Sequence, residues 1–124
     1  MNPPPQLRIG PSGWRFPGWD GVVYPAAGPS RLHPLRYLAG HFGVVEIEST
    51  QRRPLRPEVA HMWLGMVSGR PGFQFTAVLD RRFTHERLLD KAEIARFKEG
   101  LAPLARAGRF GCLVLGFPWA FRFT

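Results

Sequence analysis

The 124-residue sequence contains one cysteine, two lysines and only nine acidic residues, and these shortages exclude several classes of protein. The single Cys112 excludes an intrachain disulfide framework and fits a reducing compartment. No apolar run approaches the length of a membrane span, and the start MNPPPQLR lacks the apolar segment of a secretory signal. We therefore expect a soluble cytoplasmic protein with no membrane partner.

Basic and aromatic residues are abundant by contrast. Seventeen Lys and Arg residues give a formal charge of +8, which favours an anionic partner, with nucleic acid the usual candidate. Fifteen of them are Arg, so an Arg-rich genome is the alternative explanation. An apolar content of 44%, with ten Phe and four Trp, predicts one folded domain over residues 7–124. Residues 1–6 read as a flexible Pro-rich leader.

Four short apolar segments bounded by turn residues predict strands, and three helix-period segments lie between them. The predicted strands are residues 7–13, 43–50, 72–79 and 111–117. The first helix has Leu35, Leu38 and Phe42 on one stripe, and the second begins at Pro57, a favoured first-turn residue. Asp90 and Glu93 have capping-box spacing at the start of the third helix, which Pro103 is expected to bend or shorten.

This alternation predicts an α/β fold with parallel strands, in which a ligand binds beyond the carboxyl ends of the strands. Arginines follow each predicted strand, and they are Arg15, Arg52, Arg53, Arg81, Arg82 and Arg122. The sequence thus indicates an anion-facing rim. Partial neutralisation by Asp20, Asp80 and Glu86 is the alternative.

Several motifs occur in a characteristic order: SGW at residues 12–14, HFGVVEIEST at 41–50, FTHE at 83–86 and LVLGFPWAF at 113–121. With these motifs the chain resembles the YecE-like family, domain of unknown function 72, from Arg8 to Phe121. The resemblance implies a (β/α) barrel of the TIM type, and it implies no particular reaction. The family's barrel is about twice as long as this chain, since such barrels need roughly 250 residues. We expect an N-terminal half barrel that forms a dimer over its open face, or else a truncated or interrupted gene product.

Strand alternation places Glu46 and Glu48 on the inward side of such a barrel, because Val45 and Ile47 must face the helices. A buried carboxylate needs a partner, and Arg8 faces inward on the preceding predicted strand. We therefore predict an Arg8–Glu46 ion pair, with a catalytic role for Glu46 as the alternative.

The chain differs from the family pattern near the predicted strand ends. The resemblance leads us to expect Asn, Lys and Gln where the chain has Glu48, Val78 and Gly116, and a Phe-Tyr pair at 51 and 52, where it has Gln51 and Arg52. The missing Lys and Gln remove an ammonium and an amide, so any activity that depends on them is in doubt.

His85 and Glu86 place an imidazole next to a carboxylate after the third predicted strand. With Glu48 they could perform acid–base catalysis, or with Glu46 or Glu48 bind a divalent metal, although their spacing is not a metal motif. The alternative is that Thr84 and His85 hydrogen-bond the loop while Glu86 pairs with Arg82 or Arg53. No Gly-rich phosphate loop, Ser-His-Asp order or CxxC is present, so we expect no cofactor.

Aromatic residues surround Arg15 in the loop GWRFPGWDG. Exposed aromatics beside Arg can stack on bases or sugars, and for Trp14 both this role and packing of the loop stay open, whereas Phe16 and Trp19 are expected to pack the loop down. Trp119 has the same two interpretations, stacking on a ligand or packing of its loop. Cys112 is expected to be a small core residue.

Two functional predictions follow. The first is binding of a phosphate-bearing or other anionic ligand, with nucleic acid as one candidate, at a site comprising Trp14, Arg15, Ser49, Thr50, Arg52, Arg53, Arg81 and Arg82, with Glu48, His85 and Glu86 as candidate catalytic residues. The second is a catalytically inactive remnant that acts through dimerisation or partner binding.

Overall fold

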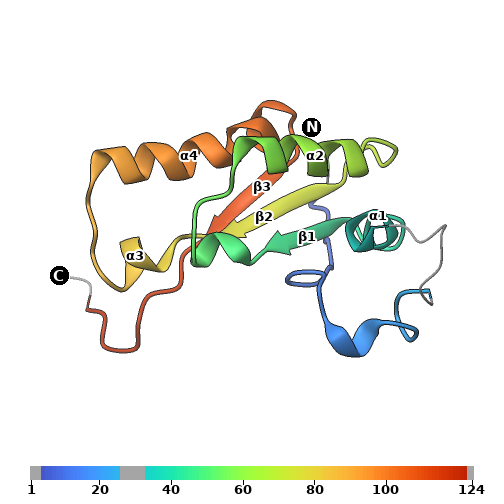
Figure 1. Ribbon diagram of the computed structural model, residues 1–124, viewed down its shortest axis with the longest axis horizontal. Coiled ribbons are helices and arrows are strands. Elements are labelled where there is room, and N and C mark those ends of the chain that lie inside the picture. Colours follow the sequence, from blue (N-terminus) through green and yellow to red (C-terminus); the bar gives the residue numbers. More distant parts are fainter. Residues whose placement is uncertain (1–3, 26–32, 123–124) are drawn as a thin grey trace.

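Three parallel strands form the sheet, in the order β1-β2-β3, and helices cover one face of it (Figure 1). The computed structural model describes residues 4–25 and 33–122. The elements are η1 (Pro17–Trp19), α1 (Pro34–Ala39), β1 (Val44–Ile47), η2 (Ser49–Gln51), α2 (Pro57–Met66), β2 (Gln74–Val78), α3 (Arg81–Thr84), α4 (Lys91–Arg106) and β3 (Phe110–Val114). The α/β class and the parallel pairing are confirmed. Within the described ranges, no helix is long and apolar enough to cross a membrane.

The prediction of a first strand over residues 7–13 is wrong. This segment makes only two backbone hydrogen bonds to β1: Glu46 N–H donates to Pro11 O at 3.0 Å, and Gly13 N–H donates to Glu46 O at 2.9 Å. The next bond of a parallel ladder would use the amide of residue 11, and proline has no N–H. Gly10 also lies so close to β1 that a Cβ there would be 1.7 Å from Val44 O. In the part of the chain that the structure describes, the sheet therefore has three strands instead of the four expected.

A register shift in β3 explains why the prediction for Cys112 is wrong. Phe75 is opposite Phe110, but the next residue, Thr76, is opposite Cys112, so Gly111 is an extra residue in the ladder. The bulge places Cys112 beside Thr76 on the side away from the helices, where the thiol is exposed.

The helix starts agree with their sequence signals. Pro57 is the first residue of α2, and the Asp90 side chain accepts a hydrogen bond from Glu93 N at 3.0 Å at the start of α4. Pro103 is inside α4 and buried, but the helix continues to Arg106, so the proline does not shorten it. Phe42 lies beyond the end of α1 and is half-buried.

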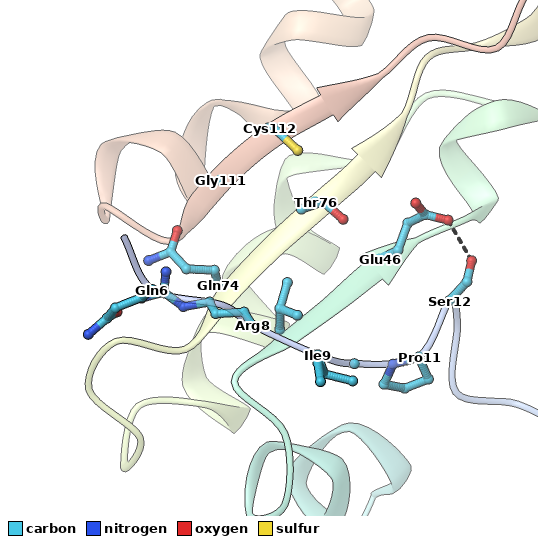
Figure 2. A pocket seen from close by; sticks show the side chains of 12 residues that line it. Gln6, Arg8, Ile9, Pro11, Ser12, Glu46, Gln74, Thr76, Gly111 and Cys112 are labelled. Carbon is cyan, nitrogen blue, oxygen red and sulfur yellow. Dashed lines mark hydrogen bonds between the residues drawn. The ribbon is translucent and has the colours of Figure 1, made fainter. Parts of the chain in front are cut away.

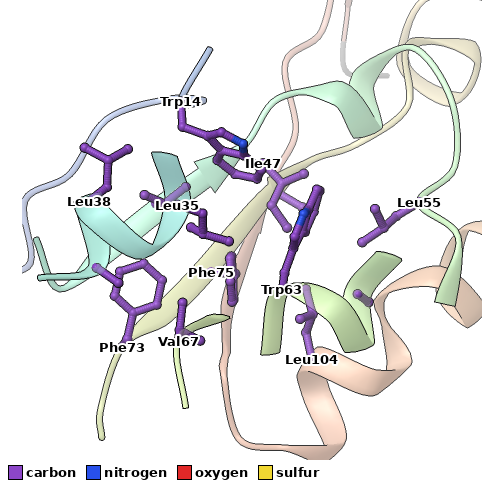
Figure 3. Close-up of a cluster of buried hydrophobic side chains, with 14 of the residues drawn as sticks. Trp14, Leu35, Leu38, Ile47, Leu55, Trp63, Val67, Phe73, Phe75 and Leu104 are labelled. Atoms are coloured by element: carbon purple, nitrogen blue, oxygen red, sulfur yellow. The ribbon is translucent and has the colours of Figure 1, made fainter. Parts of the chain in front are cut away.

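The core lies between the sheet and the helices (Figure 3). Alternate strand residues face it, including Val45, Ile47, Phe75 and Ala77, which are at most 1% exposed. Leu35 and Leu38 of α1, Trp63 of α2 and Leu104 of α4 cover them. Because α1, α2 and α4 all pack on the same face of the sheet, the described part of the chain has two layers.

The opposite face of the sheet is open. Glu46 and Thr76 on it are half-buried, while Cys112 and Val114 are exposed (Figure 2). The chain after β3 also exposes large apolar side chains, with Phe117 44% and Trp119 99% exposed. A parallel sheet usually has both faces covered, so this face is an unusual surface for a single chain.

Candidate functional site

The carboxyl end of β1 is held next to that of β2 by Thr50. Its Oγ1 lies 3.1 Å from Ile47 O and 2.7 Å from Val78 O, and the side chain is fully buried. Thr50 was predicted to contact a ligand. Its hydroxyl instead joins the two strand ends and fixes the position of η2.

A cavity of about 330 Å³ opens at this end of β1. Five of the predicted site residues line it together, namely Trp14, Arg15, Glu48, Ser49 and Arg53. Its apolar side includes Ile47, Met62 and Trp63, and it also contains His33. An adjoining cavity of about 360 Å³ shares Glu48, Ser49 and Arg53 and adds Arg52. The arginines after the first two predicted strands therefore converge on one region.

Aromatic packing holds the loop that carries Arg15. Trp14 is only 8% exposed, and its ring meets the edge of Trp63 with centroids 4.8 Å apart. The hydroxyl of Tyr24 donates to Trp14 O at 2.6 Å, and burial, with a further contribution from Asp20, raises the pKa of Tyr24. Trp14 thus forms a wall of the cavity and has little free ring surface for stacking.

Trp19 packs against the core as expected, with Phe16 against it at a centroid distance of 4.4 Å. Trp119 has the opposite environment, since it is almost fully exposed. The aromatic loop before α1 is therefore mainly structural. It presents Arg15 at the rim of the cavity.

His33 is a site residue that the sequence analysis missed. Its Nδ1 accepts a hydrogen bond from Leu35 N at 3.1 Å, which caps α1. Burial lowers the pKa of His33, and the charges of Arg15 and Arg36 lower it further. A neutral ring that accepts at Nδ1 carries its hydrogen on Nε2, so His33 is a hydrogen-bond donor. The only sequence signal was its position before Pro34 and Leu35, which indicates a helix cap and not a cavity.

The charged groups of the cavity form no ion pairs within the described ranges. Arg15, Arg53 and Glu48 are all exposed, and no ion pair joins them to one another or to other described side chains. The Glu48 carboxylate lies against Gly13, where a Cβ would be 3.1 Å from its Cδ. Gly13 also has φ +80°, so two independent reasons favour glycine at this position. These guanidinium groups are available for a ligand.

Arg82 differs from the other rim arginines because, among the described residues, its guanidinium pairs with carboxylates. Its guanidinium lies 3.0 Å from Asp80 and 3.1 Å from Glu93, and Asp80 is fully buried. The hydrogen bond from Arg82 to Asp80 raises the pKa of Arg82 above its ordinary value, and the negative charges of Asp80 and Glu93 raise it further. At Arg82 the structure therefore agrees with the alternative prediction, in which Asp80 neutralises part of the arginine rim. Arg81 is exposed.

A known family matches nearly the whole chain. The family described as "protein of unknown function DUF72" matches residues 8–124. The chain belongs to the DUF72 family. No curated protein and no solved structure matches it significantly. The YecE-like resemblance is therefore confirmed.

In this DUF72 chain, His85 and Glu86 do not lie in the cavities that Glu48 lines. His85 Nδ1 is 2.8 Å from the hydroxyl of Thr84, and both His85 and Glu86 are exposed. Glu86 does not pair with Arg82, which is bound to Asp80 and Glu93. In the part of the chain that the structure describes, no three His, Cys, Asp or Glu side chains come close enough to hold a metal ion.

Two positions where the chain differs from the expected DUF72 pattern lie at the strand ends. Val78 is half-buried at the end of β2, opposite Val114, and Gly116 is exposed in the segment after β3. Neither offers a side-chain polar group. The polar groups of the site therefore come from the loops around β1.

The predicted Arg8–Glu46 ion pair is not formed among the described residues. Glu46 accepts a hydrogen bond from the Ser12 hydroxyl at 2.6 Å (Figure 2). Arg8 donates to Gly72 O at 3.4 Å. The reason is the register, because Ser12 pairs with Glu46 and Arg8 lies further back, against Gly43. Both charges line a cavity of about 600 Å³ on the open face of the DUF72 sheet, at different levels along the strands.

Proposed function

We propose that this DUF72 protein binds a small phosphate-bearing ligand in the cavity at the carboxyl end of β1. The observation that supports this most is that Arg15 and Arg53 line one cavity without an ion-pair partner among the described side chains. Guanidinium groups bind phosphate oxygens with paired hydrogen bonds. Ser49 and His33 add hydroxyl and imidazole donors, which suit the same oxygens.

The dimensions favour a small ligand over a nucleic acid duplex. A volume of about 330 Å³ is at the lower end of small-molecule sites, and a duplex would have to lie across the rim outside it. Arg52 in the adjoining cavity can contact a second anionic group. Oligonucleotide binding is thus a separate prediction, and its affinity should fall steeply with added salt.

Loss of the cavity arginines should weaken phosphate binding. We expect Arg53→Gln and Arg15→Gln each to lower the affinity for inorganic phosphate about tenfold, because each removes a charge-assisted contact. Arg70→Gln is the matched control, since Arg70 is exposed before β2, at the opposite end of the sheet. Titration calorimetry at low salt gives the affinities. Equal binding by the parent and the cavity variants, or an equal loss in Arg70→Gln, would contradict the proposal.

We also propose that the sheet is part of a (β/α) barrel. The strands follow one another in sequence order, and α1, α2 and α4 all pack on one face, as the helices of a barrel do. A doubly wound sheet would have helices on both faces. The segment of Pro11–Gly13 runs parallel to β1 at the free edge, at the position of a preceding strand.

A second candidate function is self-association through the open face, which we propose because its charges are complementary to a second copy. Arg8 and Glu46 lie at different levels on this face and do not pair within the chain. A two-fold axis in the plane of contact, perpendicular to the strands, would place Arg8 of each copy near Glu46 of the other. The exposed Val114 and Cys112 would be covered at the same time.

Charge reversal tests this association. Light scattering should give twice the mass of one chain for the parent, and a dissociated chain for Arg8→Glu or Glu46→Arg, because like charges would then face each other. The double variant Arg8→Glu/Glu46→Arg should recover the dimer. Cys112, the single cysteine, should also react more slowly with a maleimide in the parent dimer than in the dissociated variants, because the contact covers it. A parent that is monomeric at every concentration would overturn the proposal.

A further inference from the structure

Glu48 is the unexpected group in a cavity suited to anions. It lines the cavity of about 330 Å³ and the adjoining one of about 360 Å³, each of which also contains Arg53, and its carboxylate lies against Gly13 on the cavity wall. It forms no ion pair with Arg15 or Arg53 among the described side chains. The carboxylate therefore does not act as a simple counter-charge for these arginines, and its oxygens can accept hydrogen bonds from a ligand.

The charges restrict what that ligand can be. A ligand that is anionic over its whole length would place a negative group near Glu48, which is unfavourable. An ammonium group at Glu48 would share one cavity with the guanidinium groups of Arg15 and Arg53, which repel it. Neutral hydroxyl groups avoid both conflicts, since they donate to a carboxylate and tolerate nearby guanidinium groups.

The wall of the cavity fits the same chemistry. Ile47, Met62 and Trp63 form an apolar side next to the charged one. Sugars present C–H groups on one side of the ring and hydroxyls at its edge, so such a wall can contact the ring while Glu48 accepts from its hydroxyls. His33, whose Nδ1 is used by the cap of α1, can donate from Nε2 to a phosphate or ring oxygen.

We infer that the ligand is a phosphorylated sugar or other polyol, with its phosphate on Arg15 and Arg53 and its hydroxyls on Glu48. This inference rests on the proposed phosphate-binding function and adds the part of the ligand that Glu48 recognises. Glu48 then has a binding role that the arginines cannot fill.

Two probes, inorganic phosphate and ribose 5-phosphate, separate the two claims. The parent should bind ribose 5-phosphate at least about tenfold more tightly than inorganic phosphate, because hydroxyl contacts to a carboxylate are charge-assisted. Glu48→Gln should remove most of that difference and leave the affinity for inorganic phosphate equal or slightly higher. Arg53→Gln should weaken both probes. Glu99→Gln, on the exposed side of α4, is the matched control and should change neither.

The outcomes distinguish the failure of each claim. If neither probe binds, the proposed function is wrong. If inorganic phosphate binds and ribose 5-phosphate binds no better, the proposed function holds and the inference is overturned. The inference is also overturned if Glu48→Gln weakens both probes equally, since Glu48 would then only support the shape of the loop. Circular dichroism of each variant confirms that the fold is intact.

Discussion

Substitution of Gly100 by alanine should destabilise the protein strongly, although the change lies inside a helix, where alanine is normally favoured. Gly100 is buried in α4, and a Cβ there would lie 1.9 Å from Leu55 O and 2.8 Å from Leu55 C. Both are backbone atoms, so the contact cannot be relieved by a side-chain rotation. The helix would have to move away from residues 54–56, and overpacking of this kind costs about 3 kcal/mol or more. Urea unfolding followed by tryptophan fluorescence measures the change.

Gly65→Ala in α2 is the matched control. A Cβ at Gly65 would meet no heavy atom within 4 Å, and the residue is exposed. The ordinary helix preference then applies, and alanine should stabilise the protein by about 0.5–1 kcal/mol. A Gly100→Ala protein as stable as the parent would show that α4 does not pack this closely on residues 54–56.

The sequence predicted the helices and the sheet class well because their signals are local. Pro57 and the pair of Asp90 and Glu93 act within one helical turn, and the structure has both helix starts where these residues indicate them. Alternation in residues 44–47 and 74–78 likewise depends only on neighbours, and the buried residues there alternate as expected. Membership of the family was predictable because several of its motifs occur in a characteristic order within residues 8–124.

The errors arose where pairing between segments decides the structure. Residues 7–13 have the composition of a strand, but Pro11 lacks the amide that would extend the ladder with β1. The extra residue Gly111 is visible only once β2 and β3 are paired, and it moves Cys112 from the core side to the open face. The register between residues 7–13 and β1 separates Arg8 from Glu46, and it likewise depends on how the two segments pair.

The candidate site was predictable in part. Arg15 and Arg53 follow predicted strands, Glu48 and Ser49 lie at the end of one, and parallel topology brings such residues to one end of a sheet. His33 was missed because it precedes a helix and not a sheet end, and its place in the cavity depends on how α1 packs. Thr50 and Arg82 have the right residue types for a ligand site. In the fold, however, Thr50 bonds to Val78 and Arg82 pairs with Asp80. Composition does not reveal such burial or such partners.

Arg82→Gln should therefore reduce stability and leave phosphate affinity unchanged. Asp80 is fully buried, and Arg82 supplies three side-chain hydrogen bonds to its carboxylate, at 3.2, 3.2 and 3.0 Å. In the variant the carboxylate would keep the backbone bond from residue 82, at 2.9 Å in the parent, and lose its counter-charge. Leaving a buried charge unpaired costs about 3 kcal/mol, at the lower end of the usual range because the Arg82 side chain is 30% exposed.

Two further variants separate the loss of this ion pair from a general effect of charge. Arg81→Gln removes the same charge from the preceding, exposed residue, so it should change the free energy of unfolding by less than about 0.5 kcal/mol. Asp80→Asn combined with Arg82→Gln should recover part of the loss, because the buried negative charge is then gone while the amide oxygen can still cap α3. If Arg82→Gln lowers phosphate affinity in a protein as stable as the parent, Arg82 belongs to the ligand site, and Asp80 holds it there for binding.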